Sequence, residues 1–311
     1  MTAHTIHALD LNFLEIPNAI AAYLVPHAHG AVLVECGPGS TQAQLTSALA
    51  AQGYTPADIS DVLLTHIHLD HAGAAGWLAQ QGARIHVHAV GAPHLLNPEK
   101  LLNSATRLYG DLMDHLWGQF LPVPTEKLLV VGDNDVIEIE GLRFKALDTP
   151  GHASHHLAYI LENTCFSGDV GGVRMNTPSL VHVRIPAVPP EFHIEKWRQS
   201  VTRLQQENIQ RIAPTHFGIF PDAGAHLFAV AKALDEIESW MESTLPADPP
   251  LSQLQDEFVA WAEQRSLNAG LDEAWVAAFE AANPSAMSAG GIQRYWRKVR
   301  AGDADSTSGS R

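Results

Sequence analysis

The chain has 311 residues, of which 46% are hydrophobic and 17% are charged, a balance that allows a substantial core. Its 19 basic and 34 acidic residues give a formal charge of −15. Because nucleic acid is a dense polyanion, a chain this acidic is a poor candidate for binding it. No secretion signal opens the sequence, and no apolar run approaches the ~20 residues of a membrane helix. We therefore expect a cytoplasmic protein with neither nucleic acid nor a membrane as a partner.

Apolar runs separated by turn residues define the elements expected in the first 125 residues. The sequence predicts a hairpin of residues 19–25 and 31–35, helices at 41–52, 74–81 and 101–120, and strands at 62–64 and 84–88. Ser40 is the expected N-cap of the first helix. Cys36 and Cys165 each follow or lie in a predicted strand, where they are expected to pack as small hydrophobes and not to form a disulfide.

The middle of the chain repeats this mixture of strands and helices. The sequence predicts strands at 136–139, 142–147, 157–161, 164–166 and 211–214, and a helix at 190–207. Two hairpin-led halves with interspersed helices predict an α/β fold in which two sheets are sandwiched between helices, the αββα arrangement. We assign residues 1–222 to this domain.

The character of the sequence changes after residue 222. Helical spacing of apolar residues predicts a helix at 223–245, which the proline-rich residues 246–250 end. Ser252 and Gln255 have the spacing of a capping box and predict that a second helix starts there. Two more helices are expected at 271–282 and 285–299. Residues 223–300 thus form a predicted helical appendage, and residues 301–311 a predicted disordered tail.

A cluster of metal-ligand residue types follows the strand predicted at 62–64. The segment T-H-I-H-L-D-H contributes His66, His68, Asp70 and His71. Further along the chain, three short motifs supply one candidate each: His152 in T-P-G-H, Asp169 in S-G-D and His216 in P-T-H. Imidazole and carboxylate together suit zinc, iron or manganese. Four ligands within six residues need a loop, and α/β folds place such loops at the carboxyl ends of strands.

With these motifs in this order, the chain resembles the metallo-β-lactamase superfamily over roughly residues 5–220, and the glyoxalase II-like hydrolases in particular. The resemblance implies two divalent metal ions, with zinc first and iron or manganese as alternatives. It implies that His66, His68 and His152 hold the first ion, that Asp70, His71 and His216 hold the second, and that Asp169 bridges them. It also implies a hydroxide held between the ions as the nucleophile, with Asp70 the ligand expected to serve catalysis as well.

Four further residues are weaker candidates for a role in the site. Arg174 and Arg184 follow the bridging Asp169 in a stretch that borders the substrate in relatives, and either could receive a substrate carboxylate. A salt bridge within the protein is the alternative for both arginines. His155 and His156 lie three and four residues after a ligand, where one of them could orient it.

The function expected from these residues is hydrolysis of a small acyl compound. A thioester is the leading substrate, as in a hydroxyacylglutathione hydrolase, because a thiolate with a pKa near ~8.5 leaves without a general acid. A lactone uses the same ligands, and a phosphodiester is disfavoured by the negative charge. The alternative of another class is a regulatory protein that retains the metal site. The C-terminal segment shows no match to glutathione-binding basic residues, and the oligomeric state stays open.

Overall fold

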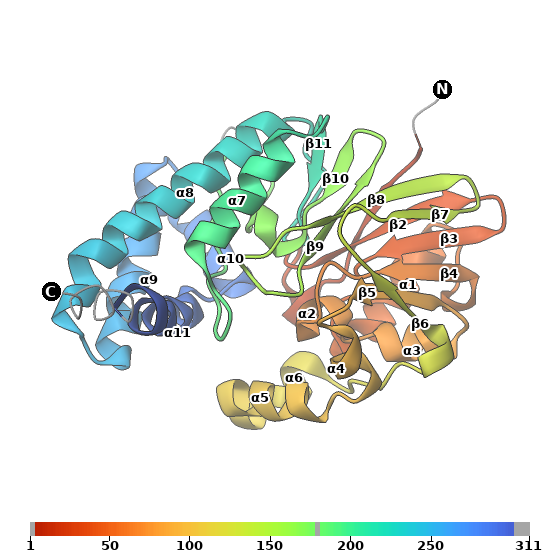
Figure 1. The fold of residues 1–311 in the computed structure, drawn as a ribbon, viewed down its shortest axis with the longest axis horizontal. Coiled ribbons are helices and arrows are strands. Elements are labelled where there is room, and N and C mark those ends of the chain that lie inside the picture. The colour runs from red at the N-terminus through yellow and green to blue at the C-terminus, as the bar shows by residue number, and fades with distance from the viewer. Residues whose placement is uncertain (1–3, 178–180, 302–311) are drawn as a thin grey trace, which may run out of the picture.

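The computed structural model describes residues 4–177 and 181–301, and its strands form two sheets (Figure 1). The first sheet has the order β1-β2-β3-β4-β5-β6: His7–Asp10, Ala21–His27, Gly30–Val34, Ile59–Leu63, Arg84–His88 and Leu128–Val131. The second has the order β11-β10-β9-β8-β7: Arg211–Ala213, Thr164–Phe166, Leu157–Leu161, Leu142–Asp148 and Val136–Ile139. Both are mixed, since β3 to β6 run parallel in the first and β10 and β11 run parallel in the second.

The two faces of each sheet are both buried. In β2, Tyr23 and Val25 point into the core between the sheets, whereas Leu24 points into the core on the outer face. Side chains of a strand alternate between faces, so a strand covered on both sides is apolar throughout. This explains why the predicted hairpin appeared as two unbroken apolar runs. Tyr159 of β9 belongs to the inter-sheet core, and its hydroxyl donates to the carbonyl of Leu64 at 2.9 Å.

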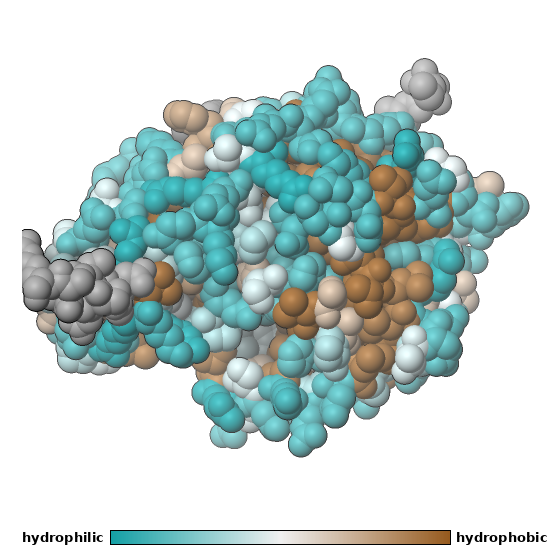
Figure 2. Space-filling model, viewed as in Figure 1, coloured by the Kyte–Doolittle hydropathy of each residue, from teal (hydrophilic) through white to brown (hydrophobic). Residues whose placement is uncertain are grey.

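Helices cover the outer faces, which confirms the αββα prediction. On the first sheet, α1 (Gln42–Ala51) and α3 (Ala75–Gln80) pack through a shared apolar core. On the second, α7 (Ile194–Gln205) and α8 (Ala223–Thr244) contribute apolar side chains to one continuous core with the strands. Figure 2 shows hydrophilic side chains over α7 and α8, as amphipathic helices with one buried face require.

Two local predictions for the first half of the chain are wrong. The expected helix at 101–120 is broken into α5 (Glu99–Tyr109), a 3₁₀ turn (Gly110–Leu112) and α6 (Met113–Trp117), because Gly110 adopts a positive φ of 53° that ends α5. A further short helix, α4 (Ala92–Leu96), precedes them. Ser40 does not cap α1; its hydroxyl donates to the carbonyl of Leu116 at 2.6 Å.

The C-terminal segment is helical, as predicted. It contains α8, α9 (Leu251–Asn268), α10 (Glu273–Ala282) and α11 (Ser285–Tyr295), which continues into a π-helical turn. The capping box is wrong, since α9 begins at Leu251 and places Ser252 inside the helix. The domain boundaries stay predictions, and residues 302–311 of the predicted tail lie outside the described residues. None of the helices within the described ranges is long and apolar enough to span a membrane.

Both cysteines are buried and free, as predicted.

Candidate metal centre

The seven predicted ligands come together at one end of the sandwich. His66 and His68 lie in the loop after β4, and α2 (Leu69–Ala72) follows at once with Asp70 and His71. The other three come from loops of the second sheet: His152 after β8, Asp169 in a 3₁₀ turn after β10, and His216 after β11. The prediction that strand ends deliver these side chains to one place is confirmed.

Asp70, His71 and His216 form one cluster. Nε2 of His71 and Nε2 of His216 each lie 3.4 Å from Oδ2 of Asp70. The same two nitrogens lie 3.3 Å and 3.6 Å from Oδ1 of Asp169. Four ligand atoms, two nitrogens and two oxygens, thus surround one point.

His66, His68 and His152 form the other cluster, with ligating atoms that all lie within 4.8 Å of one another. Nδ1 of His68 lies 2.9 Å from Nε2 of His152, and Nε2 of His152 lies 3.4 Å from Oδ2 of Asp169. Asp169 therefore turns one oxygen to each cluster, the geometry of a bridging carboxylate.

The spacing of the atoms around Asp169 fits a tetrahedral ion. Ligands about 2.0–2.2 Å from such an ion lie roughly 3.3–3.6 Å from one another. The contacts that Asp169 makes with His71, His152 and His216 fall in this range. Nε2 of His66, His71 and His216 and Oδ1 of Asp169 are buried without a hydrogen-bond partner among the described residues. Buried polar atoms left in this way are costly, and a cation would satisfy them.

The electrostatics of the site also favour positive charge. Burial opposes protonation of His71, yet the carboxylates of Asp70 and Asp169 outweigh it and hold the pKa of His71 well above its usual value. Burial lowers the pKa of His66 and of His152 well below the usual value, so these rings are neutral and keep a lone pair for a metal. The residues present therefore fit a pair of divalent cations.

The outer nitrogens of the ligand rings are fixed by oxygens. Nδ1 of His152 donates to the carbonyl of Pro186 at 2.9 Å, and Nδ1 of His216 donates to the carbonyl of Ala19 at 2.7 Å. Nδ1 of His66 lies 3.0 Å from the hydroxyl of Thr65. A proton on the outer nitrogen leaves Nε2 free to face the ion, which orients each ligand before it binds.

Glu35 is a residue that sequence reasoning missed. Its carboxylate is buried behind the ligands, accepts hydrogen bonds from the hydroxyls of Thr65 and Thr215, and lies 3.3 Å from Nδ1 of His71. A buried carboxylate next to an imidazole raises the basicity of that ligand. Glu35 ends a predicted strand, and its only sequence signal was a charge directly after four apolar residues.

The turn that carries Asp169 is held by a hydrogen bond to His156 and packs closely against Thr65. Nε2 of His156 accepts a hydrogen bond from the amide of Val170 at 3.4 Å, and its Nδ1 lies 2.8 Å from the hydroxyl of Thr149. His156 therefore holds the turn that carries Asp169, and its ring lies beside that of the ligand His66, with centroids 5.1 Å apart. Within the same turn Gly168 has a φ of 49°, and a Cβ there would meet the Thr65 hydroxyl at 2.5 Å.

The two arginines expected near the substrate are buried elsewhere. Arg174 makes two hydrogen bonds to Asp222, at 2.8 and 2.9 Å, and its guanidinium lies 3.9 Å from the centre of the Phe220 ring. Arg184 pairs with Glu280. Neither arginine lines the cavity that opens onto the metal-ligand residues. Both arginines form salt bridges within the protein, which was the alternative interpretation, so neither is assigned to substrate binding.

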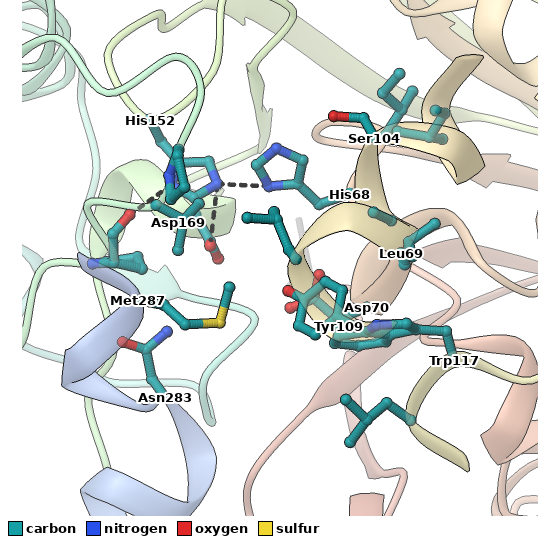
Figure 3. A pocket seen from close by; sticks show the side chains of 18 of the residues that line it. His68, Leu69, Asp70, Ser104, Tyr109, Trp117, His152, Asp169, Asn283 and Met287 are labelled. Carbon is teal, nitrogen blue, oxygen red and sulfur yellow. Dashed lines mark hydrogen bonds and ion pairs between the residues drawn. The ribbon is translucent and has the colours of Figure 1, made fainter. Parts of the chain in front are cut away.

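A cavity of about 380 Å³ opens onto the ligands. His68, Asp70, His152, Asp169 and His216 line it, whereas His66 and His71 lie behind them. Figure 3 shows Met287 approaching the ligands from one side and Ser104 and Trp117 from the other. Residues of α10 and α11 contribute one wall, whereas α8 and α9 do not line the cavity. His155 also lines it, and burial lowers the pKa of its ring to about 3.

The fold and the paired His/Asp clusters define a metallo-hydrolase of the αββα type. A family model described as "Metallo-beta-lactamase superfamily" matches residues 16–216, and the chain belongs to this superfamily.

The chain is similar to several proteins at low sequence identity. The "Metallo-beta-lactamase fold-containing protein ST1585" of Sulfurisphaera tokodaii is 26% identical over 70% of this chain and 80% of its own length. The crystal structure of ST1585 superposes with a TM-score of 0.62 over 94% of this chain and 99% of that chain, at 19% identity. A hydroxyacylglutathione hydrolase of Ectopseudomonas mendocina is 29% identical over 61% of this chain and 66% of its own length. An "Atrochrysone carboxyl ACP thioesterase" of Aspergillus fumigatus is 32% identical over 44% of this chain and only 35% of its own length.

Proposed function

We propose that the chain hydrolyses a small carbonyl ester in a metal-dependent reaction, with a thioester as the first substrate class. The observation that carries this proposal is the convergence of seven His and Asp side chains on two clusters that share Asp169 and face a cavity. Two relatives bear the names hydroxyacylglutathione hydrolase and ACP thioesterase, which supports a thioester.

The residues of the site have separable tasks. His66, His68 and His152 would hold one divalent cation, Asp70, His71 and His216 would hold the other, and Asp169 would hold both. When bound, such a pair polarises a carbonyl oxygen and supplies a strong nucleophile from water near neutral pH. Zinc is the first candidate, with iron and manganese as alternatives, because all three accept imidazole together with carboxylate.

The leaving group decides between a thioester and a lactone. A thiolate leaves unprotonated, because its pKa is only ~8.5. A lactone expels an alkoxide, which needs a hydrogen-bond donor. Tyr109 lines the cavity, and burial together with the charge of Asp70 raises the pKa of its hydroxyl, so this group keeps its proton and can donate. This observation keeps a lactonase as the second candidate function.

A side-by-side assay on the metal-replete enzyme tests the proposal. The substrates are an acyl-glutathione, a second acyl thioester, an aliphatic lactone and bis(p-nitrophenyl) phosphate, and the Asp169→Ala variant is the control for contaminating activity. We expect kcat/KM to be highest for a thioester and lowest for the phosphodiester. The highest kcat/KM on the phosphodiester would overturn the carbonyl assignment, and no turnover of any substrate would favour a regulatory role.

A further inference from the structure

The cavity beside the metal-ligand residues has two apolar walls that come from separate parts of the chain. Leu101, Ala105 and Leu108 of α5 follow one another at helical spacing and line one wall. Ala281 and Met287, from the end of α10 and from α11, line the other. The walls are therefore built from the segment between β5 and β6 and from the C-terminal helices.

An aromatic group extends the first wall. The Trp117 ring stacks on Phe13 with centroids 5.6 Å apart, and Tyr109 meets Trp117 edge to face at 5.0 Å. All three aromatic residues line the cavity. The apolar surface continues to the mouth, where the lining residue Leu108 is 50% exposed. Water against such a surface is displaced favourably by an apolar ligand.

The charges around the cavity disfavour an anionic ligand. Among its lining residues, all of which lie in the described part of the chain, Lys100 is the one Lys or Arg. Away from the metal ligands, Glu191 adds a negative charge. Arg174 and Arg184 are paired with Asp222 and Glu280, so they are not available to a ligand carboxylate. A glutathione moiety, which carries free carboxylates, would find few cationic partners here.

We propose that this cavity binds a neutral, apolar acyl chain of medium length. The inference rests on the proposed function, because the acyl carbonyl must reach the two clusters of metal-ligand residues while the acyl chain lies between α5 and the α10–α11 segment. The volume of about 380 Å³ is within the range of ~300–1,000 Å³ that is usual for small-molecule sites. The substrate is then an apolar acyl thioester or ester, and the hydroxyacyl group of a glyoxalase II substrate is too small and polar to use these walls.

A series with one constant leaving group tests this inference on the metal-replete, full-length protein. The substrates are the acetyl, butanoyl, hexanoyl and octanoyl thioesters of N-acetylcysteamine, with the adipoyl thioester as a partner of the hexanoyl compound that ends in a carboxylate. Each buried methylene contributes up to about fourfold in binding. We expect kcat/KM to rise at least about tenfold from butanoyl to octanoyl, and the adipoyl thioester to be at least about tenfold poorer than hexanoyl. A flat series, or adipoyl equal to hexanoyl, would overturn the inference.

Variants at exposed positions of the cavity wall test where the acyl chain of the substrate lies. Ala281→Trp should lower kcat/KM for the octanoyl thioester at least about tenfold more than it lowers kcat/KM for the acetyl compound. Ala277→Trp is the matched control, since Ala277 is exposed one turn earlier on α10 and does not line the cavity. Leu108→Asp should act like Ala281→Trp, with Thr106→Asp on the same helix as its control. Equal effects of a cavity variant and its control would contradict the assignment.

A binding measurement separates failure of this inference from failure of the proposed function. Isothermal titration calorimetry compares octanoate with butanoate on wild-type protein and on Ala281→Trp. Tighter binding of octanoate that Ala281→Trp weakens would support the apolar cavity even if no thioester were cleaved. Thioester cleavage without any dependence on chain length, or octanoate no tighter than butanoate, would reject the cavity assignment while leaving the proposed function standing.

Discussion

His226 should make the protein sensitive to mild acid. This residue of α8 is fully buried, and its Nε2 donates to the carbonyl of Gly171 at 2.7 Å, in the turn that carries Asp169. Its Nδ1 accepts from Arg174 at 3.2 Å, and Arg174 is held in turn by Asp222. Both ring nitrogens are thus committed to the neutral form.

Burial, aided by the charge of Arg174, lowers the pKa of His226 from 6.5 to about 4. The unfolded chain then binds a proton more readily than the folded chain, so stability is full above the unfolded-state value and falls as the pH drops from 6.5 towards 4. A shift of this size is worth roughly 3 kcal/mol when fully expressed, and about 2 kcal/mol at pH 5.

The variant His226→Gln tests this reasoning, because glutamine offers a donor and an acceptor but does not titrate. Urea unfolding of wild type and variant at pH 7.5 and pH 5 gives the loss of unfolding free energy between the two values. We expect the loss to be about 2 kcal/mol smaller in the variant. His115→Gln, at an exposed histidine, is the control and should leave the loss unchanged. Equal losses in wild type and His226→Gln would refute the argument.

Three further predictions concern the metal centre and the loops that support it. Asp169→Ala and His68→Ala should each lower turnover more than about tenfold, or ~1.4 kcal/mol, and elemental analysis should find fewer than the two metal equivalents expected for wild type. Glu35→Gln should weaken metal binding about 10–100-fold in a chelator competition, and an unchanged affinity would remove its orienting role. Gly151→Ala should lower Tm, since a Cβ at this φ of 142° would meet the α7 backbone at 2.4 Å. Gly224→Ala is the control and should leave Tm unchanged, because a Cβ there meets nothing within 4 Å.

Local patterns in the sequence were enough for the candidate metal ligands and most strands. The H-x-H-x-D-H segment is short and follows an apolar strand, so its position at a strand end could be predicted without knowing the partner sheet. The short strands β1 and β6 were missed: His7–Asp10 has little pattern of its own, whereas Leu128–Val131 is an apolar run that a sequence-based prediction could have included. Pairing with β2 and β5 makes them strands, and such pairing is tertiary information.

The partners of buried charges are decided by contacts distant in sequence. Arg184 pairs with Glu280, 96 residues away, and Glu35 receives a hydrogen bond from Thr215, 180 residues away. No local pattern distinguishes such an arginine from one that binds a substrate, because both are cationic side chains near a catalytic motif. The shape and polarity of the cavity likewise exist only once α5 and the α10–α11 segment face each other across the metal ligands. The sequence by itself determined which residues can bind metal, since that depends on donor chemistry and short spacing. Only the tertiary structure decided what kind of substrate can reach them, since packing between remote segments builds the walls.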